Sequence, residues 1–178
     1  HEESLFQQRL ISDIHRAVEE KQLKVYFQPK YRIQGQRPVL GSAEALIRWQ
    51  HPEFGMISPG RFIPLFEENG LINILDYYVW KGAAEQIRDW KDRYGFSVPV
   101  SVNVSRMDIY DENLERKMLK LLDDNRLTPS DYMLEITESA YAEDADRLIE
   151  VVENLRGKGF KVEMDDFGSG YSSLNMLT

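Results

Sequence analysis

Lys161-Val162-Glu163-Met164-Asp165-Asp166, together with the turn Phe167-Gly168-Ser169-Gly170, is the stretch around which the fold is organised. It predicts a strand that ends in two adjacent carboxylates. Two like charges about 4 Å apart repel by about 4 kcal/mol at the effective dielectric near a protein surface, so a fold that keeps such a pair usually holds a cation there. The alternative is an Asp-rich turn, because Asp and Gly also dominate turns for backbone reasons. The stretch alone favours the turn, and the rest of the chain reverses that preference.

Composition restricts the class of protein. The chain has 178 residues, of which 42% are hydrophobic and 29% charged, as expected for one soluble domain with a core. It has no cysteine, which excludes disulfides and thiolate metal sites, and its three histidines are too scattered for a histidine-rich zinc site. With a net charge of −8 and no basic patch, a nucleic-acid duplex is not an expected partner. An anionic ligand stays compatible if metal ions supply positive charge.

No apolar run reaches the roughly 20 residues that a membrane helix needs. We therefore expect no membrane contact from this segment and a cytoplasmic location. A membrane anchor in the parent protein would lie in upstream segments.

Predicted strands and helices alternate along the chain. Helical spacing predicts helices over residues 4–21, 59–68, 71–94, 114–124, 144–158 and 171–177. Strands are predicted over residues 24–28, 98–104, 132–136 and 160–165, with Pro29 ending the first and 51–55 forming a turn. Residues 39–49 are ambiguous, since Glu-Ala-Leu favours a helix whereas Gly41 and the flanking turns fit a strand. Counting them as a strand gives about five strands in βαβ units, and hence an α/β fold with a mostly parallel sheet.

The polar faces of these strands carry a common feature. Side chains alternate between faces along a strand, so Ala43, Ala45, Ile47 and Trp49 would share one face of 39–49 and Glu44 and Arg48 the other. Each strand then has an apolar face for helices and an oxygen ligand near its carboxyl end. This is the layout of a (β/α) barrel, whose active sites lie at that rim. The residues expected to converge there are Glu44, Asn103, Glu135 and Asp165, with Asp166 and Glu138 on adjoining loops.

Carboxylate and amide oxygens without sulfur or histidine predict a site for magnesium, manganese or calcium. Each residue taken singly is better interpreted as an exposed polar residue. Agreement among four strand ends favours a shared site.

Several motifs resemble one family. Glu44-Ala45-Leu46-Ile47-Arg48-Trp49 is similar to the signature of the EAL domain, a family of bacterial cyclic di-GMP phosphodiesterases. The resemblance continues, in the same order, at Tyr26–Pro29, Ser101–Arg106, Leu134–Glu138 and Asp165–Leu174. It spans roughly residues 7–178.

The resemblance implies a TIM-like (β/α)8 barrel whose first strand is antiparallel to the others. It also implies hydrolysis of cyclic di-GMP to linear pGpG, with two divalent cations, Mg²⁺ or Mn²⁺, as cofactors and Ca²⁺ as an inhibitory occupant. A homodimer is the expected assembly.

The same resemblance implies roles for individual residues. One metal would be held by Glu44, Asn103, Glu135 and Asp165, and Asp165 would bridge to a second metal that Asp166 also binds. The catalytic set would be Glu44, Asp165, Asp166 and Glu138, with Glu138 holding the loop after the last strand. Arg48 would contact the substrate phosphate, where a guanidinium fork fits bidentately, and Gln28 would lie at the substrate end.

The chain is shorter than the family's barrel, which typically needs about 250 residues. We therefore expect residues 1–178 to form a single, incomplete EAL domain, with residues 1–8 as the end of a linker from an upstream domain. The family's later lysine, glutamate and glutamine are absent, so this chain on its own is expected to be inactive. Because unpaired sheet edges recruit other strands, it is also expected to pair or aggregate.

Two other functions stay open. One is a module that senses cyclic di-GMP without cleaving it, and the other is a scaffold or dimerisation domain without a ligand. The intact set of predicted ligands favours the enzyme.

Overall fold

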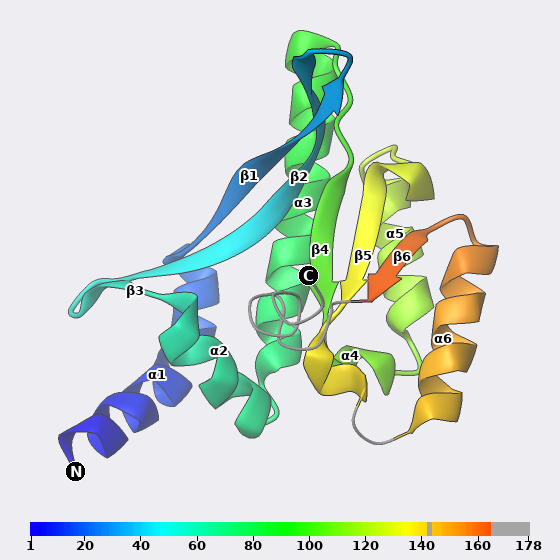
Figure 1. Ribbon diagram of the computed structural model, residues 1–178. Helices are drawn as coiled ribbons and strands as arrows, with labels where there is room; N and C mark the ends of the chain where they lie inside the picture. Colours follow the sequence, from blue (N-terminus) through cyan, green and yellow to red (C-terminus); the bar gives the residue numbers. More distant parts are fainter. Residues whose placement is uncertain (142–143, 165–178) are drawn as a thin grey trace.

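The computed structural model describes residues 1–141 and 144–164, which form one twisted sheet with helices packed against it (Figure 1). The strands are β1 (Leu23–Gln34), β2 (Arg37–His51), β3 (Gly55–Ile57), β4 (Val100–Val104), β5 (Tyr132–Ile136) and β6 (Lys161–Met164). The helices are α1 (Glu2–Glu19), α2 (Pro59–Glu68), α3 (Ile72–Tyr94), α4 (Arg106–Ile109), α5 (Leu114–Asp124) and α6 (Ala145–Gly157). Short 3-10 helices cover Pro129–Asp131 and Glu138–Tyr141.

The sheet confirms the predicted fold class. Its strand order is β1-β2-β4-β5-β6, with β3 paired to β2. β1 is antiparallel to β2, whereas β2, β4, β5 and β6 are mutually parallel, and β4 to β6 point to the same edge in Figure 1. The helices between the parallel strands, α3, α5 and α6, lie along one face of the sheet (Figure 1). In the described part of the chain the sheet is open, with β1 and β6 at its two ends.

The prediction that Pro29 ends the first strand is wrong. β1 continues through Pro29 to Gln34, and Pro29 pairs with Ala43 of β2. β1 is the end strand of the described sheet, so the missing backbone N–H of proline interrupts no second ladder. The register shifts one residue later, where Gly41 is the extra residue of a bulge.

The ambiguous segment 39–49 is a strand. Ala43, Ala45, Ile47 and Trp49 are all at most 6% exposed, as predicted for the helix-facing side of β2. β3 was not predicted, because three residues are too few to show an alternating pattern. The strand predicted from Val98 begins only at Val100, although Val98 is buried.

The remaining predicted elements agree closely with the observed ones. Residues 2–8 are helical as part of α1, and their expected origin in a linker from an upstream domain stays a prediction. The helix predicted over 171–177 and the residues Asp165 and Asp166 lie outside the described residues.

Helix α3 is hydrogen-bonded to two central strands, β4 and β5. The indole Nε1 of Trp80 on α3 donates to the backbone oxygen of Asn103 on β4 at 2.9 Å, and the Tyr132 hydroxyl of β5 donates to the backbone oxygen of Trp80. Trp80 and Tyr132 are almost fully buried. These bonds join α3 to two adjacent strands.

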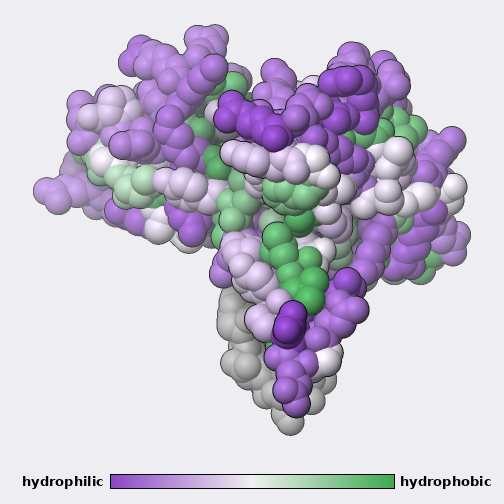
Figure 2. Space-filling view, turned by 90° about the horizontal axis from the view of Figure 1, so that it is seen from above, coloured by the Kyte–Doolittle hydropathy of each residue, from purple (hydrophilic) through white to green (hydrophobic). Residues whose placement is uncertain are grey.

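Seen from above, the end of the molecule opposite the edge to which β4 to β6 point is mostly hydrophilic, with a limited strip of hydrophobic side chains near its middle (Figure 2). Exposed large hydrophobic residues include Tyr31, Ile33 and Leu40 on the β1–β2 hairpin and Tyr94 at the end of α3. Among the described helices, none combines the length and hydropathy needed to cross a bilayer.

A buried pair of carboxyl groups joins α3 to the turn after β4. Asp76 on α3 is 8% exposed and Asp108 on α4 is 3% exposed. Asp108 Oδ2 accepts hydrogen bonds from the backbone N and the hydroxyl of Ser105, both at 2.9 Å. Burial, followed by the hydrogen bond and the charge of Asp108, raises the pKa of Asp76 well above its usual range. The fold therefore favours the protonated form of Asp76.

We expect Asp76→Asn to stabilise the protein at pH 7–8. Because the folded-state pKa of Asp76 is raised, the contribution of Asp76 to wild-type stability is greatest below the unfolded-state pKa, about 3.9, and is lost as the pH rises through the folded-state value. Asparagine supplies a donor to Asp108 without binding a proton. The gain should grow as the pH rises from 4 to 8 and should vanish near pH 4.

Urea unfolding at pH 4 and pH 8 measures this difference. The control is Glu153→Gln, which neutralises an exposed carboxylate on α6 and should have no comparable effect. A variant less stable than wild type at both pH values would contradict a protonated Asp76.

Candidate metal centre

The strand register brings the predicted ligands to one face of the sheet. Glu44 of β2 pairs with Ser101 of β4, and Asn103, two residues further along, pairs with Glu135 of β5. Paired residues of adjacent strands project to the same side, as do residues two positions apart on one strand. Glu44, Asn103 and Glu135 therefore share the face opposite the helix-facing alanines of β2.

These three residues lie at different depths. Glu135 is 9% exposed, whereas Glu44 and Asn103 are half-buried. Glu163, which pairs with Glu135 in register, is exposed, and its Oε1 lies 3.5 Å from Lys161 Nζ. The acidic character of this face is therefore greatest around Glu44 and Glu135.

A lysine that the sequence did not indicate connects these two carboxylates. Lys30 Nζ lies 3.2 Å from Glu44 Oε1 and 3.6 Å from Glu135 Oε1. Partial burial lowers the pKa of Lys30, but its contacts with the two carboxylates outweigh that effect and raise the pKa above the ordinary lysine value. Lys30 directly follows Pro29, where the first strand was predicted to end. It was missed because it fell outside any predicted strand.

The two predicted substrate residues lie on β1 and β2. Gln28 is the antiparallel partner of Glu44, so it projects to the same face beside a predicted ligand. The Arg48 guanidinium donates to the backbone oxygen of Ile47 at 3.0 Å and stands 6.0 Å from the Tyr26 ring centroid. Beyond Glu44 the ladder between β2 and β4 ends, and Arg48 and Asn103 both line a cavity of about 70 Å³.

The structure tests the rest of the predicted site only partly. Glu138 is exposed at the start of the 3-10 helix that directly follows β5. The loop it is predicted to hold, from Asp165 to Tyr171, lies outside the described residues. Asp165 and Asp166 lie outside them as well, so their predicted convergence with Glu44 stays a prediction.

The donors on this face fit a hard cation. A lysine ammonium already stands between Glu44 and Glu135, which shows that the two carboxylates reach a common positive charge. The hydroxyl oxygen of Ser101, next to Glu44 in register, is buried without a hydrogen-bond partner. Within residues 1–141 and 144–164, three or more His, Cys, Asp or Glu side chains nowhere cluster closely enough to hold a metal ion. A metal centre at this face would need further oxygen donors, and the predicted one, Asp165, lies outside the described residues.

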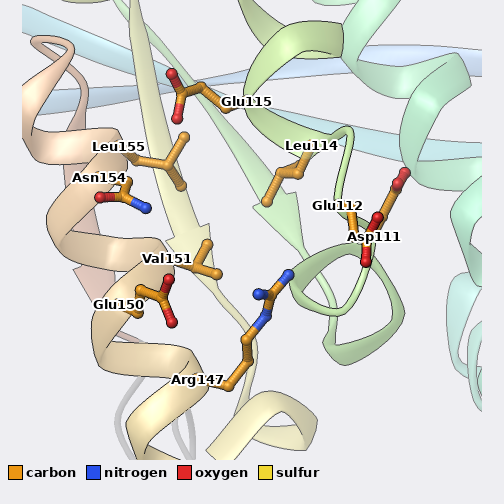
Figure 3. A pocket seen from close by; sticks show the side chains of 9 residues that line it. All are labelled: Asp111, Glu112, Leu114, Glu115, Arg147, Glu150, Val151, Asn154 and Leu155. Atoms are coloured by element: carbon orange, nitrogen blue, oxygen red, sulfur yellow. The ribbon is translucent and has the colours of Figure 1, made fainter.

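A second cavity, of about 270 Å³, lies within the helical layer (Figure 3). Its lining residues come from α5, α6 and the segment before α5: Asp111, Glu112, Leu114, Glu115, Arg147, Glu150, Val151, Asn154 and Leu155. Arg147 extends from α6 into the space between the helices (Figure 3). No strand contributes to this cavity, so it is separate from the candidate metal centre.

Comparison with known proteins agrees with this geometry. The family model described as "EAL domain" matches residues 11–178. The chain is 38% identical over 171 residues to the bifunctional diguanylate cyclase/cyclic di-GMP phosphodiesterase MucR of Pseudomonas aeruginosa, covering 96% of this chain and 25% of that protein. It is 34% identical over 168 residues to the cyclic di-GMP phosphodiesterase PdeR of Escherichia coli, covering 94% and 25%.

Solved structures agree as well. The structure described as "PaMucR Phosphodiesterase, c-di-GMP complex" matches with a TM-score of 0.80 at 37% identity, covering 95% of this chain and 68% of that one. The chain thus spans about a quarter of the length of the two curated relatives. Because the family model covers almost the whole chain and the sheet has the family's antiparallel first strand, this chain belongs to the EAL domain family.

Proposed function

We propose that the complete domain containing this chain is a metal-dependent phosphodiesterase that hydrolyses cyclic di-GMP to linear pGpG. The observation that carries the proposal is the pair Glu44 and Glu135, which the sheet brings to one face and to one shared cation. The names of MucR and PdeR, both cyclic di-GMP phosphodiesterases, support the choice of substrate.

The proposed roles follow the positions of the residues. Glu44, Asn103 and Glu135 would hold one divalent cation together with Asp165, and Asp165 and Asp166 would hold a second. Mg²⁺ or Mn²⁺ in these positions would lower the pKa of an attacking water and neutralise charge that develops on the phosphate. Ca²⁺ would occupy the same oxygen donors as an inhibitor, because its ligand geometry is looser.

The side chains around the ligands would position the substrate. Arg48 would release its contact with the Ile47 carbonyl and orient a phosphate through paired N–H groups. Gln28, opposite Glu44, would contact the substrate beside the metal. Glu138 would hold the loop after β6. Hydrolysis adds one water across one phosphodiester, and the P–O bond to the 3′ oxygen breaks.

A sensor that binds cyclic di-GMP without cleaving it is the second candidate. Lys30 favours it, because an internal cation already neutralises Glu44 and Glu135. The phosphodiesterase would hydrolyse the cyclic di-GMP that it binds, whereas the sensor would bind it without hydrolysis.

We expect divalent metal to stabilise the full-length protein against heat. A ligand that binds only the folded state adds about 2.7 kcal/mol at a hundredfold excess over its Kd. Thermal melts with and without millimolar Mn²⁺ measure the effect. Glu135→Gln should abolish the shift because it removes a buried ligand, whereas Glu153→Gln on α6 should retain it. An unchanged melting temperature in wild type would count against an assembled site.

We expect full-length protein to convert cyclic di-GMP to pGpG, and Glu44→Gln to reduce turnover by about a hundredfold or more. Losing even an outer-shell partner of a metal ligand costs 10–100-fold, so losing a ligand should cost at least that much. Arg48→Lys should also lose activity, because lysine keeps the charge but not the bidentate fork. Chromatography of the nucleotide products measures both.

Glu153→Gln serves as the control and should match wild type. Full turnover in Glu44→Gln would refute its assignment as a ligand. Binding of cyclic di-GMP without turnover in wild type would favour the sensor.

A further inference from the structure

We propose that Lys30 is a tethered counter-cation of the metal centre: it neutralises Glu44 and Glu135 when metal is absent and competes with a divalent cation for them. The proposal rests on the proposed function only in taking these two carboxylates as metal ligands. It adds a residue that sets metal affinity.

The contacts of Lys30 carry the proposal. A single ammonium nitrogen lies within 4 Å of carboxylate oxygens from two different strands, β2 and β5, while Lys30 itself comes from β1. Its side chain therefore spans the site face from the end of the described sheet. The Glu135 side chain is only 12% exposed, so water screens this contact poorly.

Competition follows from the geometry. A metal ion bound jointly by Glu44 and Glu135 would occupy the region now held by the ammonium group. Two positive charges cannot share that position at contact distance, because they repel and because each needs the same oxygen lone pairs. Metal binding therefore requires Lys30 to leave.

A cavity beside Lys30 could receive its side chain when metal binds. Lys30 also lines a cavity of about 450 Å³ whose other lining residues include Ser42, Met133 and Lys161. The lysine stem has four flexible carbons, and the side chain is 47% exposed. Rotation about the bonds of this stem would carry the ammonium group toward the cavity.

The test measures Mn²⁺ affinity by titration calorimetry on the full-length protein. Lys30→Met keeps the length of the stem but removes the charge, and Lys30→Gln is a second variant with a polar end. Each should bind Mn²⁺ at least about tenfold more tightly than wild type, a gain of one order of magnitude in Kd. Lys120→Met is the matched control, because Lys120 forms an exposed ion pair with Asp124 on α5 at 2.8 Å. Its affinity should equal that of wild type.

Thermal melts give a second readout, independent of catalysis. Without metal, Lys30→Met should melt below wild type, since it leaves two carboxylates without their cation. With saturating Mn²⁺ the difference should disappear, so the metal-induced shift should be larger in the variant.

Equal or weaker Mn²⁺ binding by both folded Lys30 variants would overturn the proposal, as would the absence of Mn²⁺ binding in wild type and variants alike. Mn²⁺ binding by the variants but not by wild type would support it. The two proposals can fail separately. If wild type does not hydrolyse cyclic di-GMP but Lys30→Met still binds Mn²⁺ more than tenfold more tightly than wild type, the proposed function fails and the role of Lys30 stands.

Discussion

Repulsion between two carboxylates is the constraint on which this site depends. The parallel register of β2, β4 and β5 directs Glu44 and Glu135 to the same face, and neither can turn away without reversing the burial of its strand. Since the opposite face of β2 is packed with buried alanine, isoleucine and tryptophan side chains, the sheet keeps both acids where they are. A cation is then required, and Lys30 provides one from β1.

The helices pack against the opposite face of the sheet and hold the strands that carry these carboxylates (Figure 1). Trp80 on α3 donates a hydrogen bond to the backbone oxygen of Asn103, the proposed amide ligand, and its own backbone oxygen accepts one from Tyr132 at the start of β5. Asp76, one turn earlier on α3, meets Asp108 just beyond the turn that follows β4. The backbone of Asn103, which pairs with Glu135, is thus held from the far side of the sheet by a residue outside the proposed ligand set.

The antiparallel hairpin gives the site a residue that a purely parallel barrel would place elsewhere. Because β1 runs against β2, the residues after Pro29 move away from the carboxyl ends of the parallel strands, toward their amino ends. A long side chain is needed to reach back to Glu44 and Glu135, and lysine has that length. The chemistry at this face therefore combines short carboxylates from β2 and β5 with one long cation from β1.

Local pattern predicted the α/β class and most element bounds, and it predicted the two faces of β2 once residues 39–49 were counted as a strand. The alternation of Ala43, Ala45, Ile47 and Trp49 is a property of neighbouring residues, and burial confirms it. The motifs that resemble the EAL domain likewise lie within single segments, and the family match confirms them.

Only the tertiary structure decided the contacts that join distant segments. Strand β1 can continue through Pro29 because β1 lies at the end of the described sheet, and no local pattern reveals that position. The contacts of Lys30 with Glu44 and Glu135 join residues 14 and 105 positions apart, and the Asp76–Asp108 pair joins two helices. Pairings of this kind arise from packing and register, because the free energy that holds them comes from burial of the whole sheet and not from the residues beside them in the chain.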